Sequence, residues 1–254
     1  MSDQVKVMKG AESYSAAGDR RGALILHGFT GCPQSMRPLA ETFATAGFSV
    51  ELPRLPGHGT TPEDMAETDW GNWAAAVENA YRDLSARTDS IVVGGLSMGG
   101  SLTLWLAERH PEIAGIVLVN PAVEPDDFGD FVAGAQGVID AGGVFLPGVA
   151  GDIADPSAKE LGYDRSPAKS LLSLINGLEA LKPKLANIKV PTLLLHSKQD
   201  HIIPPGSAAL VRDKLGKSVE YVALEKSFHV ATIDYDGAEI NRRAIDFGTR
   251  VSRR

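Results

Sequence analysis

The chain has little cysteine, few aromatic residues and no long apolar run, and each shortage excludes a class of protein. Its 254 residues contain a single cysteine, Cys32, and 6% aromatic residues. One cysteine allows no internal disulfide and fits the reducing cytoplasm. No apolar stretch approaches bilayer-spanning length, and the first residues lack the basic-then-apolar pattern of a signal peptide. We therefore predict a cytoplasmic protein with no stable membrane anchoring.

An excess of positive charge is also missing. Lysine and arginine number 25 against 32 aspartates and glutamates, which gives a formal net charge of −7. This balance offers no electrostatic reason to bind nucleic acid. No spacing of histidine, cysteine and carboxylate residues is typical of a metal site. We therefore expect no nucleic acid and no metal, and composition leaves the oligomeric state open.

The chain does have enough apolar residues for one sizeable core, with strand and helix patterns in alternation. A 43% hydrophobic content over 254 residues predicts one domain at 1–254. After an antiparallel amino-terminal region, apolar patterns predict strands at 23–27, 48–52, 91–96, 115–120, 191–196 and 218–224. Helices are expected at 35–46, 69–87, 99–109, 206–215 and 237–251. The alternation predicts an α/β fold, with a mostly parallel central sheet and helices on both faces.

A glycine-flanked serine follows the strand predicted at 91–96. Residues 95–99 read Gly-Leu-Ser-Met-Gly, and helical apolar spacing begins directly after them. This context makes the motif informative, because the serine sits on a sharp turn where a side chain at Gly95 or Gly99 would crowd backbone. The positive end of the helix would stabilise an anionic tetrahedral intermediate at Ser97. The motif predicts a nucleophile; the alternative is a glycine-rich connection with an incidental serine.

A serine nucleophile needs a nearby base and a group that orients the base. On this kind of scaffold the expected chain order is nucleophile, acid and histidine. Asp200 follows one predicted buried strand, and His229 follows the next. Both therefore lie past the carboxyl ends of strands, where open α/β sheets collect functional groups. We predict Asp200 as the acid and His229 as the base.

Two rival acids follow His229 closely, Asp234 and Asp236. Residues 236–239 look like a capping box with Glu239 at its third helical position, so we expect these aspartates to cap the last helix. Structural positions are expected for the other histidines, which are His27, His58, His110, His196 and His201.

A second turn follows the strand predicted at 23–27. Residues 27–31 read His-Gly-Phe-Thr-Gly. Such a turn can offer a backbone N–H to an oxyanion, together with the N–H of the residue after the nucleophile. We assign these two donors to Phe29 and Met98 and place Gly28 at the substrate. The alternative is an ordinary joint between strand and loop.

One segment interrupts the alternation. Between Asn120 and Thr192 lie far more residues than a crossover helix needs. The part at about 122–165 mixes glycine and aspartate with apolar residues, and we interpret it as a small inserted lid over Ser97. Phe145 and Leu146 are predicted to form part of its acyl-binding wall. A helical hairpin that extends the core is the alternative, and residues 166–185 are predicted as a returning core helix.

Together these motifs resemble those of the α/β-hydrolase superfamily, and more narrowly its bacterial carboxylesterase and monoacylglycerol-lipase-like branch. The segments that carry the resemblance are residues 27–31, 55–59 (Leu-Pro-Gly-His-Gly), 95–100, 199–204 and 227–229. The resemblance implies the α/β-hydrolase fold and a lid, with Ser97 as acylated nucleophile, His229 as general base and Asp200 as its orienter. It also implies that no cofactor is required.

The sequence therefore predicts a serine hydrolase that cleaves small-molecule carboxylic esters through an acyl-enzyme. Monoacylglycerols or similar short-to-medium acyl esters rank first because the lid candidate is apolar. Thioesterase, lactonase, carbon–carbon bond hydrolase and cofactor-free haloperoxidase chemistry use similar triads and remain alternatives. A non-catalytic protein that binds a hydrophobic ligand is the alternative from a different class.

Overall fold

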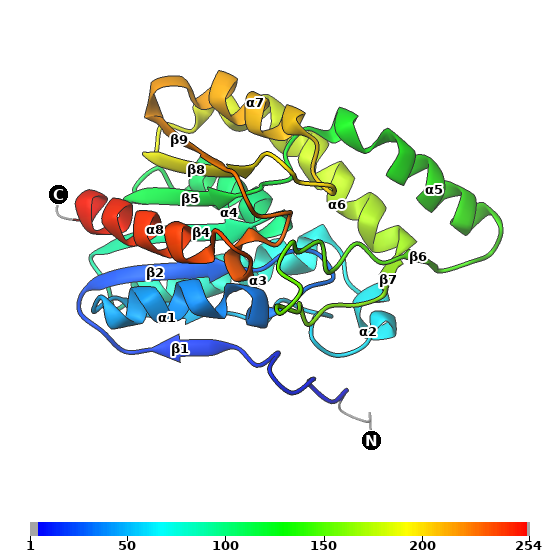
Figure 1. Ribbon diagram of the computed structural model, residues 1–254, viewed down its shortest axis with the longest axis horizontal. Helices are drawn as coiled ribbons and strands as arrows, with labels where there is room; N and C mark the ends of the chain where they lie inside the picture. Colours follow the sequence, from blue (N-terminus) through cyan, green and yellow to red (C-terminus); the bar gives the residue numbers. More distant parts are fainter. Residues whose placement is uncertain (1–4, 253–254) are drawn as a thin grey trace.

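A seven-stranded sheet forms the centre of the computed structural model, which describes residues 5–252 (Figure 1). The strand order is β1-β3-β2-β4-β5-β8-β9, and only the β1–β3 pair is antiparallel. The strands are β1 (Tyr14–Ala16), β2 (Arg21–Leu26), β3 (Ser49–Leu52), β4 (Ser90–Leu96), β5 (Gly115–Val119), β8 (Thr192–Ser197) and β9 (Val219–Leu224). The predicted strands and mostly parallel sheet are confirmed.

Strand register brings several loops to one edge of the sheet. Leu26 of β2 pairs with Gly95 of β4. Val119 of β5 pairs with Leu96 of β4 on one side and with Leu195 of β8 on the other. All residues of β5 are buried, as expected where helices cover both faces of a parallel sheet. The loops that follow these parallel strands therefore meet above their carboxyl ends.

Helices cover both faces of the sheet (Figure 1). On one face lie α1 (Arg37–Thr45) and α8 (Gly237–Val251), whose Phe43 and Phe247 belong to one apolar cluster. On the other lie α3 (Trp70–Ser85), α4 (Met98–Arg109) and α7 (Pro205–Leu215). Short helices are α2 (Pro62–Ala66), η1 (Pro33–Met36), η2 (Pro125–Phe128), η3 (Lys182–Asn187), η4 (Gly216–Ser218) and η5 (Ala231–Ile233). Within the described residues, none of these helices is long and apolar enough to cross a membrane.

The segment predicted as a lid, residues 122–165, is called the cap below. It contains η2, the helix α5 (Gly129–Asp140) and the strand β6 (Phe145–Pro147). A two-stranded antiparallel ribbon joins β6 to β7 (Arg165–Pro167). Helix α5 lies beside α6 (Ala168–Leu181) and extends past the sheet (Figure 1). The returning helix thus begins two residues later than predicted, because Ser166 and Pro167 are held in the extended ribbon.

The predicted capping box at the start of α8 is wrong. The Asp236 side chain makes no capping hydrogen bond to α8 and accepts hydrogen bonds from the N–H groups of Lys226 and Ser227, both at 2.9 Å. Glu239 instead pairs with Arg242 and Arg243 along the helix surface. Asp236 therefore folds the loop that leads to His229.

Candidate active site

Ser97 occupies the sharp turn between β4 and α4. Its backbone has φ 55° and ψ −120°, a conformation that costs a non-glycine residue about 1–3 kcal/mol. The flanking glycines allow the turn: a Cβ at Gly95 would lie 2.1 Å from the Gly99 carbonyl oxygen, and one at Gly99 would lie 2.3 Å from the Leu26 carbonyl oxygen. The expected crowding at both glycines is confirmed. The Ser97 residue is 9% exposed and stands at the amino terminus of α4.

The turn after β2 lies directly against Ser97. A Cβ placed at Gly28 would come within 3.3 Å of the Ser97 Cβ. Within residues 5–252, the backbone N–H groups of Phe29 and Met98 donate to no protein acceptor. Both are therefore available to an oxyanion bound at Ser97, as the predicted assignment requires.

Asp200 and His229 meet through their side chains, although they follow different strands. Nδ1 of His229 lies 2.8 Å from Oδ2 of Asp200. The second carboxylate oxygen accepts hydrogen bonds from the N–H groups of Ile202 at 2.9 Å and Ile203 at 2.8 Å. The side chains of His229 and Asp200 are 7% and 2% exposed. This fixed carboxylate favours the tautomer in which Nδ1 carries the proton and Nε2 is free to accept one.

The backbone of His229 is held at both of its polar groups. Its N–H donates to Oδ2 of Asp152 at 3.0 Å, and its carbonyl accepts from Nδ2 of Asn120 at 2.8 Å. Asn120 is fully buried with φ 44° and also accepts a hydrogen bond from the Ser197 N–H at 2.7 Å. Sequence reasoning missed Asn120 and Asp152, because neither belongs to a motif and each contacts His229 only across the fold.

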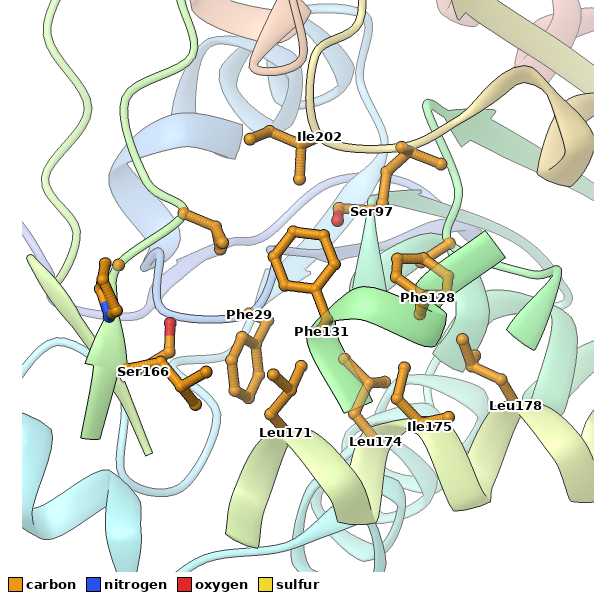
Figure 2. A pocket seen from close by; sticks show the side chains of 16 residues that line it. Phe29, Ser97, Phe128, Phe131, Ser166, Leu171, Leu174, Ile175, Leu178 and Ile202 are labelled. Carbon is orange, nitrogen blue, oxygen red and sulfur yellow. The ribbon is translucent and has the colours of Figure 1, made fainter. Parts of the chain in front are cut away.

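An apolar cavity of about 370 Å³ opens at Ser97 (Figure 2). Of its lining side chains only those of Ser97 and Ser166 are polar. The remaining lining residues are Phe29, Ala122, Phe128, Phe131, Leu146, Pro147, Gly148, Val149, Leu171, Leu174, Ile175, Leu178, Ile202 and Ile203. Figure 2 shows Leu171, Leu174, Ile175 and Leu178 of α6 along one side of this space, with Ser97 and Ile202 on the opposite side. Its size and lining suit a hydrocarbon chain.

The two predicted acyl-wall residues have different positions. Leu146 lines the cavity, but Phe145 does not, and the guanidinium of Arg165 lies 4.5 Å from the centre of its ring. From Leu146 onward, the four residues 146–149 line the cavity. Ile202 and Ile203 were missed, although an apolar pair directly after Asp200 and His201 was a signal for them.

Buried histidines support the turn that carries Phe29. Nε2 of His27 accepts a hydrogen bond from the Leu55 N–H at 3.1 Å, and the His27 and His58 rings lie 5.0 Å apart. Burial lowers the pKa of His27 to about 3 and that of His58 to about 4. Both rings are therefore neutral near pH 7 and have a structural role, as predicted.

Cys32 is also buried, and its thiol donates to the Leu161 carbonyl at 3.1 Å. Burial raises the pKa of this thiol to about 11, so it stays protonated and is a poor nucleophile.

A carboxylate that no motif indicated lies near the turn and His229. A Cβ at Gly31 would come within 2.8 Å of Oε1 of Glu160, and Oε2 accepts the Gly151 N–H at 2.8 Å. Burial raises the pKa of Glu160, and the hydrogen bond from the Gly151 N–H and the nearby His229 act in the opposite direction. No lysine or arginine in the described part of the chain forms an ion pair with it. Glu160 therefore keeps acceptor capacity beside the site.

Comparison with known proteins places these features in context. The Alpha/beta hydrolase family matches residues 23–242. A thermostable monoacylglycerol lipase from Bacillus sp. (strain H-257) is 45% identical over 97% of this chain and 98% of that protein. A carboxylesterase from Bacillus subtilis (strain 168) is 26% identical over 92% of this chain and 94% of its own length.

Solved structures with a similar fold also include lipolytic enzymes. A structure from work on LipS and LipT, two metagenome-derived lipolytic enzymes, superposes with a TM-score of 0.92 at 40% identity, covering 96% of this chain and all of that chain. A monoacylglycerol lipase from Paleococcus ferrophilus, at 21% identity and a TM-score of 0.79, shares the fold over 94% of this chain and 98% of its own.

Proposed function

Because this chain belongs to the Alpha/beta hydrolase family and is a carboxylic ester hydrolase, we propose that it cleaves monoacylglycerols and similar short-to-medium acyl esters through an acyl-enzyme. The observation that carries the proposal is the apolar cavity that reaches Ser97. Burying an acyl chain there gains about 25 cal/mol per Å² of apolar surface removed from water. The similarity to a monoacylglycerol lipase over nearly the whole chain supports the same substrate class.

In the proposed mechanism, Nε2 of His229 takes the proton from the Ser97 hydroxyl as its oxygen attacks the ester carbonyl carbon. The carbonyl oxygen becomes an oxyanion that the N–H groups of Phe29 and Met98 bind, at the positive end of α4. The Asp200 carboxylate stabilises the imidazolium. His229 then protonates the leaving alcohol, which leaves the acyl group on Ser97, and a water activated by His229 releases the acid and restores the hydroxyl.

Glu160 supports a polyol as the leaving group. Its carboxylate accepts the Gly151 N–H and has lone pairs left that can accept hydrogen bonds from free hydroxyls. A glycerol carrying one acyl chain has two such hydroxyls, whereas a p-nitrophenyl ester of the same acid has none. The Glu160→Gln variant should therefore weaken hydrolysis of monoacylglycerols more than hydrolysis of p-nitrophenyl esters.

The test is a panel of monoacylglycerols and p-nitrophenyl esters of matched chain length, with acyl-CoA, lactone and β-diketone arms. We expect the highest kcat/KM on a monoacylglycerol, and a fluorophosphonate label that is lost in Ser97→Ala together with several orders of magnitude in kcat. Preferred cleavage of a thioester, lactone or carbon–carbon bond would refute the substrate class. Equal ester turnover by Ser97→Ala, or no label on folded protein, would refute the mechanism.

We further propose that the protein works in the cytoplasm on small molecules and binds no nucleic acid. A single buried thiol and a net charge of −7 support this reading.

A further inference from the structure

Asp152 of the cap connects two loops of the site. Its Oδ2 accepts hydrogen bonds from the backbone N–H groups of His229 at 3.0 Å and His201 at 3.2 Å. Its Oδ1 lies 2.8 Å from Nδ1 of His201, and its own carbonyl accepts the Val230 N–H at 3.0 Å. His201 follows Asp200 directly. The Asp152 carboxylate therefore links the cap to the loop that carries Asp200 and to the loop that carries His229. The Asp152 side chain is only 14% exposed.

Asp234 makes the reciprocal connection from the loop after His229 back to the cap. Its Oδ2 accepts the N–H groups of Ala154 at 2.8 Å and Phe228 at 2.9 Å, and its Oδ1 accepts the Asp155 N–H at 3.0 Å. Asp152 thus binds the loops from the cap, and Asp234 binds the cap from the loop after His229. Asp234 was expected to cap α8, and these contacts give it this different role.

We infer that Asp152 is a positioning residue for ester hydrolysis: through the His229 N–H, the cap sets where the imidazole stands relative to Ser97. The inference rests on the proposed role of His229 as general base. Three groups fix this histidine: Asp200 at the ring, Asn120 at the carbonyl and Asp152 at the N–H. Asp152 is the one that belongs to the cap, so the cap contributes to the triad as well as to the acyl cavity.

The size of the effect follows from the geometry. Removal of the carboxylate leaves the His229 N–H without its acceptor in a site where the His229 residue is 6% exposed. The loop must shift to find another acceptor, and a displacement of 1 Å at a catalytic group can cost about 100-fold in rate. Asp152→Asn keeps one carbonyl oxygen able to accept both backbone N–H groups, so it should retain most of the activity.

The experiment measures kcat and KM for Asp152→Ala, Asp152→Asn and the wild type on the p-nitrophenyl ester that the wild type cleaves best. For Asp152→Ala we expect kcat to fall about 10- to 100-fold, with KM within about 2-fold. Asp152→Asn should restore kcat to within about 3-fold of wild type. Asp164→Asn is the matched control, because its side chain is in the cap and 92% exposed, and it should change neither constant.

If the cap serves only as a wall of the cavity, Asp152→Ala should raise KM and leave kcat unchanged. That result, or an unchanged kcat in folded Asp152→Ala, would overturn the inference. If Asp152→Ala does not fold, Asp152→Glu replaces it. This variant keeps the charge but moves the carboxylate by one methylene, and it should lower kcat without raising KM.

His229→Ala on the same ester separates this inference from the proposed function. Full activity of His229→Ala would refute the proposed general base. Loss of activity in His229→Ala together with a normal kcat in Asp152→Ala would refute only the positioning role of Asp152.

Discussion

Acid should destabilise this protein well before its carboxylates are protonated, because His27 and His58 are buried as neutral rings. Burial lowers their pKa values to about 3 and about 4, whereas an unfolded histidine has a pKa near 6.5. Between these limits the unfolded chain binds more protons than the folded one. The free energy of unfolding therefore has its full value above pH 6.5 and decreases as the pH falls toward 4.

The magnitude can be worked for a change from pH 7.5 to pH 5.0. Burial is the largest cause of both pKa shifts, and both rings are 0% exposed, so no discount for solvent screening is needed. A pH of 5.0 lies about 1.5 units below the pKa of an unfolded histidine but above the folded pKa of each ring. Each histidine is therefore protonated only on unfolding, which lowers the free energy of unfolding by about 2 kcal/mol per ring. The two together remove about 4 kcal/mol, a large share of the 5–15 kcal/mol typical of a folded domain.

Urea denaturation followed by circular dichroism measures the free energy of unfolding at pH 7.5 and at pH 5.0. His58→Gln keeps a side-chain donor near the Pro56 carbonyl that accepts from His58 Nδ1, but it does not titrate. Whatever its stability at pH 7.5, this variant should lose about 2 kcal/mol less than the wild type on acidification. Between pH 7.5 and 8.5 the difference between the two proteins should stay constant. Equal losses in wild type and variant would show that His58 is not buried as a neutral ring.

Two substitutions probe the turn and the cavity. Gly95→Ala places a methyl group 2.1 Å from the Gly99 carbonyl oxygen, so we expect no cooperative thermal transition by circular dichroism; a folded, active variant would contradict the tight turn. Ser166→Ala removes a hydroxyl that is 1% exposed and has no hydrogen-bond partner among residues 5–252, so the free energy of unfolding should stay equal or rise by about 1 kcal/mol. A loss of stability there would show that the Ser166 hydroxyl has a partner.

Local sequence predicted those parts of the site that depend on one strand and the turn after it. Ser97, Asp200 and His229 each follow an apolar run, and the carboxyl ends of parallel strands meet at one edge. Gly95 and Gly99 could be explained in the same way, because the crowding they avoid involves neighbouring backbone. Most of the strands could be located in the same way, because apolar runs mark them, but the order of the strands in the sheet was not predicted.

Contacts between distant segments could not be predicted. Asp152 reaches His229 across 77 residues, and Asn120 reaches it across 109. Nothing near either residue in the sequence distinguishes it from an ordinary loop polar residue. The cap had the same difficulty: its apolar content was evident, but the sequence alone did not distinguish Leu146, which lines the cavity, from Phe145, which does not. Asp236 was misassigned because a capping pattern and a loop contact look alike in one dimension.

The left-handed backbone at Ser97 has a consequence for the timing of catalysis. The free-energy cost of this conformation is offset once, when the chain folds, by the packing of β4 against α4. In the proposed mechanism the hydroxyl is thus aimed before any ester arrives, and no reorganisation of this residue has to accompany each turnover. In that mechanism the attacking oxygen stands on backbone that the turn between β4 and α4 already fixes, whichever ester enters the cavity.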